Sequence, residues 1–259
     1  MADAPYMMFI GLDTGPELDR DRQMLQRFND NYNQIHAADV TNMNPGFVRG
    51  TRYELIEPDA RGDFGPRWLM IYEMNSEAAA KGYGIRFDGP PEGRPQYRPN
   101  GLAGVDAPLR WRMFWRRHAP AAGELGAAAA PYIFMVGMNA APGSDEAGMR
   151  AFDEFYTHTH VPEVVASSRF LRGTRYELYR DYTHPERGAP RFLAVYEFDE
   201  AGIVARAMRA ANQQPGGAGL SSGPPAWEGH ETLWRLTYRR VASYVREGLR
   251  LSGSDAPSP

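Results

Sequence analysis

An internal repeat constrains the fold of this chain more than any other feature of its sequence. The hexapeptide GTRYEL at positions 50–55 recurs unchanged at positions 173–178, 123 residues later. The flanking sequence stays in register, and a histidine upstream of each copy, His36 and His160, repeats at an offset of 124. This period is well above the roughly 20–50 residues of solenoid repeats and matches a small domain. We therefore expect two related domains that pack as a pseudo-dimer.

The repeat also divides the chain into segments. The first copy covers residues 1–118 and the second covers residues 131–245, and each opens on a Pro-Tyr pair, at Pro5 and Pro131. Residues 119–130 are mostly Ala and Gly, and we expect them to form the linker. Residues 246–259 are predicted to be a tail without fixed structure.

Composition narrows the class of partner. The chain has 259 residues, 42% of them hydrophobic, a formal charge of −3 and no cysteine. This charge gives no electrostatic footprint for nucleic acid or an anionic membrane, and no stretch approaches the roughly 18 apolar residues of a membrane span. We expect a cytoplasmic protein that binds a small molecule, and self-association of the fused pair into a homo-oligomer is compatible with the sequence.

Hydrophobic patterning predicts the same order of elements in both copies: strand, helix, strand, strand, helix, strand. The expected ranges are 6–12, 17–38, 47–56, 68–74, 76–83 and 109–116 in the first copy, and 132–138, 144–160, 170–179, 192–198, 199–212 and 232–239 in the second. This order is that of the ferredoxin-like fold, an α+β architecture. Two such repeats packed sheet to sheet would form a pseudo-dimeric α/β barrel with helices outside and a cavity between the sheets.

A stripe of three residues recurs on the first helix of each copy: Phe28, Tyr32 and His36, then Phe152, Tyr156 and His160. A spacing of four places each stripe on one helical face. The histidine could be a structural cap near the helix end, or a general acid/base that reaches the cavity, since free imidazole titrates near neutral pH. Metal ligation is a third interpretation.

The segment 152–165, FDEFYTHTHVPEVV, resembles the EthD-type signature of the dimeric α/β barrel superfamily. This resemblance implies a barrel fold and marks His160, with Tyr156 beside it, as the catalytic candidate. The superfamily includes cyclases, isomerases, monooxygenases and haem enzymes. In the first copy Ala38 replaces Pro162, so the signature is degenerate around His36. We expect the chain path after the two histidines to differ, and the second copy to carry the activity.

Metal and haem sites have weaker support. His158 and His160 are two residues apart, a spacing that joins ligands on a strand but separates them on a helix. The Gly-x-x-Asp-Gly motif that the resemblance leads us to expect in dye-decolourising peroxidases is absent, because Asp13 lies one position early. His184 and His230 have no repeat partners, and we expect them to face solvent. No metal and no cofactor are therefore predicted.

Charged and aromatic residues repeat on the predicted strands. Each Arg-x-Glu unit, such as Arg175 and Glu177, places a cation and an anion on one face, which fits a structural ion-pair network. Alternatively, Arg175 could hold a substrate carboxylate or phenolate. The aromatic residues predicted to line the substrate pocket are Tyr32, Trp68, Trp111, Tyr196 and Trp234.

These observations favour a cofactor-independent enzyme that transfers a proton on an aromatic, polyketide-like or lactone substrate. His160 would be its acid/base group, Tyr156 its hydrogen-bonding helper, and His36 the matching residue of the first copy. Two other classes stay open: a non-catalytic binder of small ligands, and a haem- or metal-dependent oxidoreductase.

Overall fold

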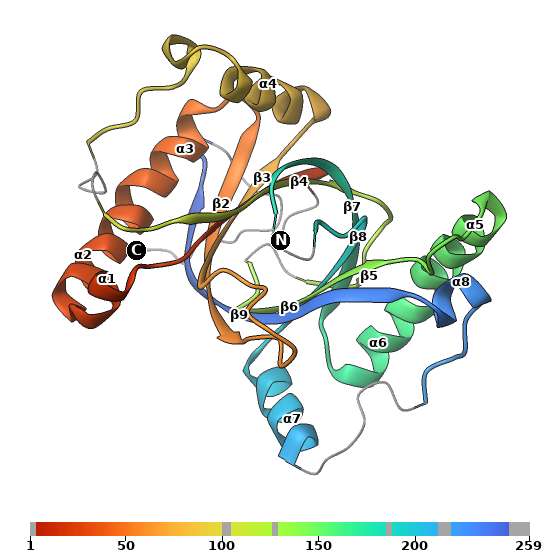
Figure 1. Ribbon diagram of the computed structural model, residues 1–259. Coiled ribbons are helices and arrows are strands. Elements are labelled where there is room, and N and C mark those ends of the chain that lie inside the picture. Colours follow the sequence, from red (N-terminus) through yellow and green to blue (C-terminus); the bar gives the residue numbers. More distant parts are fainter. Residues whose placement is uncertain (1–3, 100–104, 126–128, 185–187, 212–218, 249–259) are drawn as a thin grey trace.

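The structure is a computed structural model that describes residues 4–99, 105–125, 129–184, 188–211 and 219–248. Eight antiparallel strands form a closed barrel with helices packed on its outside (Figure 1). The strands follow the order β4-β1-β3-β2-β9-β6-β8-β7, and β7 pairs with β4 to close the ring. The expected α+β barrel is confirmed, as one continuous closed sheet.

Both halves of the chain show the same succession of elements. The first half contains β1 (Tyr6–Leu12), α1 (Pro16–Arg20), α2 (Arg22–Asn31), η1 (Tyr32–His36), α3 (Ala37–Met43), β2 (Phe47–Glu57), β3 (Trp68–Met74), α4 (Glu77–Asp88), η2 (Pro91–Gly93) and β4 (Leu109–Arg117). The second contains β6 (Tyr132–Asn139), α5 (Glu146–Phe155), η3 (Tyr156–His160), α6 (Val161–Ser168), β7 (Arg172–Thr183), β8 (Phe192–Phe198), α7 (Glu200–Ala211), α8 (Pro225–Glu228) and β9 (Glu231–Val245).

Between the halves lies β5 (Ala122–Gly123), a two-residue strand that pairs with β7. It falls within the segment predicted as a linker, of which residues 126–128 lie outside the described residues, as do residues 249–259 of the predicted tail. The division into domains stays a prediction.

The halves are joined by two equivalent strand pairs, β2 with β9 and β4 with β7. An ion pair crosses each seam: Glu54 with Arg239 at 2.7 Å, and Glu177 with Arg116 at 2.8 Å. These contacts agree with the structural interpretation of the repeated strand charges.

The barrel interior is a packed hydrophobic core. Alternate strand residues point inward, and Trp111 and Trp234 from the two halves stack there with ring centroids 5.0 Å apart. Tyr53, Tyr176 and Tyr238 belong to the same buried cluster. The expectation of a ligand cavity between the sheets is wrong, because large side chains from both halves meet on the barrel axis.

The outer face of each half packs against its own helices and forms a second core. The first long helix of each half is irregular. Asp21 caps α2 by accepting hydrogen bonds from the backbone N–H groups of Gln23 and Met24. Each Tyr-x₃-His stretch is a π-helical turn, in which the backbone N–H of Ala37 or Val161 donates to the carbonyl of Tyr32 or Tyr156.

The chain continues as a helix after both histidines, into α3 and α6. The expected difference in chain path is therefore wrong. Pro162 lies in the first turn of α6, directly after the π-helical turn, and the helix runs through it.

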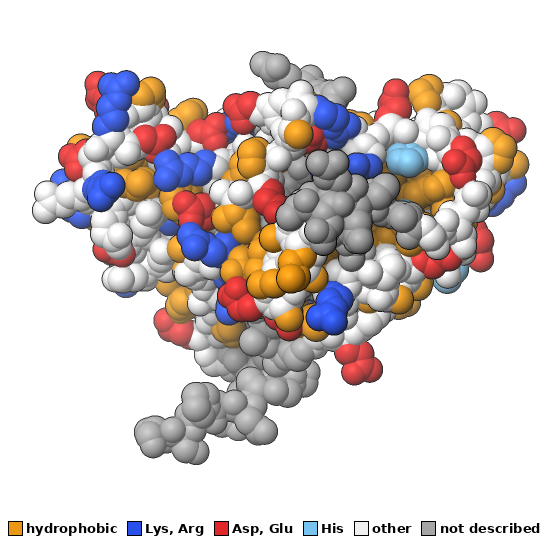
Figure 2. Space-filling view, turned by 90° about the horizontal axis from the view of Figure 1, so that it is seen from below, with side chains coloured by type: hydrophobic (Ala, Val, Ile, Leu, Met, Phe, Trp, Pro, Cys, Tyr) orange, Lys and Arg blue, Asp and Glu red, His pale blue; other side chains and the backbone are white. Residues whose placement is uncertain are grey.

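Apolar side chains reach the surface at the end of the molecule where α7 lies, and Figure 2 shows them gathered near the centre of the face seen from below. Val204 and Met208 of α7 are exposed. Among the described residues, no helix has the length and apolar character that a membrane crossing requires. Assembly into a homo-oligomer stays a prediction.

Candidate functional site

A cavity of about 740 Å³ lies on the outer face of the barrel in the second half. Outward-facing residues of β6, β8 and β9 form one side, and η3, α6, α7 and α8 form the other. Its lining consists of Glu57, Phe134, Val136, Met138, Tyr156, His160, Val164, Ser168, Phe170, Tyr196, Arg206, Leu220, Ser221, Ser222, Trp227, Glu228, His230 and Arg235.

His160 closes the π-helical turn and presents its imidazole to this cavity. Its ring centroid lies 4.3 Å from that of Trp227 and 5.7 Å from that of Tyr156. Aromatic packing holds the ring, and its nitrogens make no hydrogen bond within the described part of the chain. Both ring nitrogens are therefore available to a ligand.

The environment of His160 keeps its imidazole neutral at pH 7. Burial, and then the neighbouring His230, lower its pKa from the ordinary 6.5 to about 4. Glu163 of α6 opposes this effect, while Arg175 and Arg235 add to it. The group therefore does not titrate near neutral pH, contrary to the expectation from free imidazole.

Tyr156 begins the same turn, and its side chain is fully buried. Its hydroxyl makes no hydrogen bond with any described residue, and burial raises the pKa of this phenol. Tyr156 is therefore a neutral hydroxyl at the cavity wall with unused hydrogen-bonding capacity.

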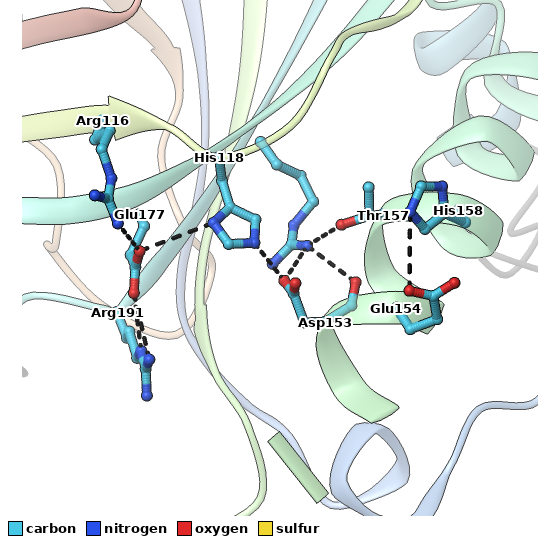
Figure 3. Close-up of polar contacts among 9 residues, drawn as sticks. Arg116, His118, Asp153, Glu154, Thr157, His158, Glu177 and Arg191 are labelled. Carbon is cyan, nitrogen blue, oxygen red and sulfur yellow. Dashed lines mark hydrogen bonds and ion pairs between the residues drawn. The ribbon is translucent and has the colours of Figure 1, made fainter. Parts of the chain in front are cut away.

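Arg175 lies behind Tyr156, outside the cavity lining. Its guanidinium stacks 4.1 Å from the centroid of the Tyr156 ring and is 2.6 Å from the carboxylate of Asp153. Thr157 accepts another hydrogen bond from it, and His118 contacts the same carboxylate at 2.6 Å (Figure 3). Burial disfavours the charged Asp153, yet its bonds to His118 and Arg175 hold its pKa below the ordinary value. Arg175 thus packs on the Tyr156 ring and does not line the cavity. The structure therefore does not place it where it could bind a substrate carboxylate in this cavity.

His230 borders the cavity, so the expectation that it faces solvent is wrong. It follows α8, and its ring stacks on Trp227 at 4.7 Å with an interplanar angle of 27°. Its Nδ1 lies 2.5 Å from the backbone carbonyl oxygen of Trp227. The repeat could not reveal His230, since the first copy has no equivalent residue. The one feature of the sequence that could have indicated His230 is that this histidine has no counterpart in the first copy.

A charged contact between the two halves lies at another side of the cavity. Glu57 at the end of β2 pairs with Arg206 of α7 at 2.8 Å and accepts a hydrogen bond from Thr237 at 2.5 Å. The Arg206 guanidinium also lies 4.4 Å from the ring centroid of Phe134. The first half therefore contributes a residue to the cavity of the second.

The structure brings together only some of the predicted site residues. Tyr196 lines the cavity with His160 and Tyr156, whereas Trp111 and Trp234 lie inside the barrel. The remaining predicted residues, Tyr32, His36 and Trp68, belong to the first half.

The first half has a similar aromatic arrangement with different surroundings. The His36 ring lies 4.9 Å from Tyr32 and 5.6 Å from Tyr97, and burial lowers the pKa of His36. Arg52 lies 4.3 Å from the Trp68 ring centroid and 4.5 Å from that of Tyr32. Across the described ranges, no three histidine or carboxylate side chains come together as a metal site.

No family model and no curated protein matches this chain. Among solved structures, an anthrone oxidase-like protein is similar, with a TM-score of 0.53 at 11% identity over 96% of this chain and 97% of that one. A chlorite dismutase mutant from Candidatus Nitrospira defluvii reaches 0.48 at 10% identity, covering 93% and 92% of the two chains. A dye-decolorizing protein from V. cholerae reaches 0.44 at 10%, covering 92% and 94%.

The first of these matches spans nearly the whole of both chains and shows a shared fold. It confirms the α/β barrel expected from the sequence at the level of the fold. The narrower EthD-like assignment stays a prediction.

Proposed function

We propose that this protein is an enzyme that moves a proton on a planar aromatic or polyketide-like small molecule, without a cofactor. The second-half cavity is the active site. His160 is the imidazole that meets the reacting atoms, and Tyr156 supplies a hydrogen bond. We also propose that the chain arose by duplication of a ferredoxin-like unit of the EthD type, since the order of elements and the GTRYEL segment recur together.

One observation carries the proposal: an imidazole with two unbonded nitrogens lies in an aromatic cavity beside an unpartnered buried hydroxyl. The cavity volume is typical of ligand sites, which span about 300–1,000 Å³. Phe134, Phe170, Tyr196 and Trp227 offer apolar faces to a flat ligand, while polar side chains reach the cavity from helices, strands and the segment before α8.

The test is proton exchange on anthrone, a flat tricyclic ketone whose ring methylene is acidic, because one protein of similar fold is anthrone oxidase-like. Loss of the methylene signal in deuterated buffer without oxygen is followed by NMR. The wild-type protein should accelerate exchange, and His160→Ala should lower the protein-catalysed rate roughly 10²–10⁴-fold.

His36→Ala is the matched control from the first half and should exchange anthrone at close to the wild-type rate. Equal losses in the two variants would contradict the assignment of the second-half cavity. Tight binding of anthrone without any acceleration would instead identify a non-catalytic binder.

A haem-dependent oxidoreductase is the second candidate, because the residues present also fit that group. The neutral His160 would hold the iron of a haem bound in this cavity of about 740 Å³, and the exposed Arg235 would pair with a carboxylate of the macrocycle. Haem would supply one-electron and oxygen chemistry. Titration with haemin should then give an absorption band that His160→Ala loses and the exposed-site control His158→Ala retains. An unchanged haemin spectrum would exclude this candidate.

A further inference from the structure

We infer that His230 is a second catalytic residue: it takes the proton from the substrate carbon, while His160 donates a hydrogen bond to the oxygen that becomes negative. The inference rests on the proposed function and narrows the substrate class to compounds with an acidic C–H conjugated to a carbonyl group. Proton abstraction and stabilisation of the negative oxygen are then carried out by two different imidazoles, whereas the sequence indicated His160 alone.

The contact between His230 and Trp227 fixes the tautomer of His230. A carbonyl oxygen only accepts hydrogen bonds, so the Nδ1 atom 2.5 Å from it carries the proton. In the neutral ring Nε2 then holds a lone pair, and it has no bonding partner in the described part of the chain. His230 therefore offers a basic nitrogen of defined orientation at the cavity wall.

His160 suits the complementary role. An imidazole with a pKa of about 4 is a weak base at neutral pH, but its neutral ring always bears one N–H that can donate. Arg175 and Arg235 act on His160 as cations, and Glu163, the carboxylate that opposes them, accepts hydrogen bonds from Ser221. The other carboxylates of the lining are also engaged: Glu57 pairs with Arg206, and Glu228 accepts from the backbone N–H of Gly223. The two arginines therefore favour negative charge on a bound oxygen.

Trp227 places the two rings around one ligand. His160 and His230 both contact its indole, at 4.3 and 4.7 Å. In the reaction, the C–H bond of the substrate breaks, its proton goes to Nε2 of His230, and its electron pair forms the C=C bond of an enolate. The charge develops on oxygen beside His160 and Tyr156. Return of a proton from His230 completes the transfer, so no oxidant or reductant is consumed.

Two conservative variants separate the roles in the anthrone exchange assay. In His230→Asn the amide nitrogen takes the place of Nδ1 and can keep the bond to the Trp227 carbonyl, but no base remains at Nε2. Its catalysed rate should fall roughly 10²–10⁴-fold. His160→Gln retains an N–H donor and should keep most of the rate, whereas His160→Ala should lose roughly 10²–10⁴-fold.

The exposed-site variant His158→Gln is the control, and circular dichroism checks that each variant is folded. If His160→Gln falls as far as His160→Ala while His230→Asn matches the wild type, His160 is the base: the inference is overturned and the proposed function stands. If the wild-type protein does not accelerate exchange, the proposed function fails, and this inference fails with it.

Discussion

The lowered pKa of His160 predicts a loss of stability on acidification that belongs to this residue. Below pH 6.5 a histidine in the unfolded chain takes up a proton, whereas the folded protein resists it until about pH 4. The unfolded state therefore binds more protons in this window, and the free energy of unfolding falls as the pH drops from 6.5 to 4. Below pH 4 both states are protonated and the loss is complete.

The size of the effect follows from the two pKa values. Each tenfold change in proton affinity is worth about 1.4 kcal/mol, so a pKa lowered from 6.5 to about 4 corresponds to ~3 kcal/mol. The variant His160→Gln lacks the titrating group. Between pH 7.5 and pH 4.5 the wild-type protein should therefore lose roughly 2–3 kcal/mol more unfolding free energy than this variant.

Urea unfolding followed by circular dichroism at both pH values measures this difference. Carboxylates such as Asp59 titrate alike in both proteins and cancel in the comparison. His158→Gln is the matched control, because its side chain is 66% exposed, and it should follow the wild type. The reasoning is refuted if the gap between wild type and His160→Gln does not change with pH, or if NMR places the titration of His160 near pH 6.5.

Three further variants test the barrel core, the cavity and a buried ion pair. Trp234→Ala should lower the free energy of unfolding by about 3–5 kcal/mol without changing anthrone affinity, since Trp234 is fully buried inside the barrel. Trp227→Ala should weaken anthrone binding. Isothermal titration calorimetry measures the anthrone affinity of both variants, and a loss of affinity in Trp234→Ala but not in Trp227→Ala would contradict the prediction. Glu197→Gln should cost about 3–5 kcal/mol, because it leaves Arg172 buried beside a neutral amide in place of a partner 2.6 Å away. A loss below 1 kcal/mol in urea unfolding would count against this pair.

Most of the architecture follows from the repeat and from side-chain alternation. Matching strand and helix patterns in two copies indicated equivalent halves joined in a barrel. Alternation alone could not say which face of the sheet is hollow, because both faces carry large aromatic residues, such as Trp234 inside the barrel and Phe134 in the cavity. The interior fills because large residues of both halves, Trp111 and Trp234, meet at the axis.

The site was predicted less completely than the fold. The recurring helical stripe indicated Tyr156 and His160, which both line the cavity, but it did not indicate the π-helical turn, since a spacing of four also suits an α-helix. Trp227 and His230 come from a segment without a repeat equivalent, so periodicity carries no signal for them. The neutral state of His160 depends on burial and on His230, which only the tertiary structure brings together.

The two halves diverge in the segment before the last strand, and equivalent carboxylates anchor that segment in each. Asp39 binds Arg98 through both its backbone N–H and its guanidinium, at 2.8 Å each. Glu163, 124 positions later, binds the backbone N–H and hydroxyl of Ser221 at 3.0 and 2.5 Å.

The residues next to each anchored position determine what lies beside the histidine of that copy. Beside Arg98, Tyr97 packs its ring 5.6 Å from His36 and bonds to Asn44, so a side chain of the protein occupies one side of that imidazole. Beside Ser221, Leu220 and Ser222 line the cavity next to His160. A retained carboxylate anchor with a changed neighbour therefore sets a tyrosine ring against the histidine in one copy and cavity-lining residues beside it in the other, while the barrel that both copies build stays the same.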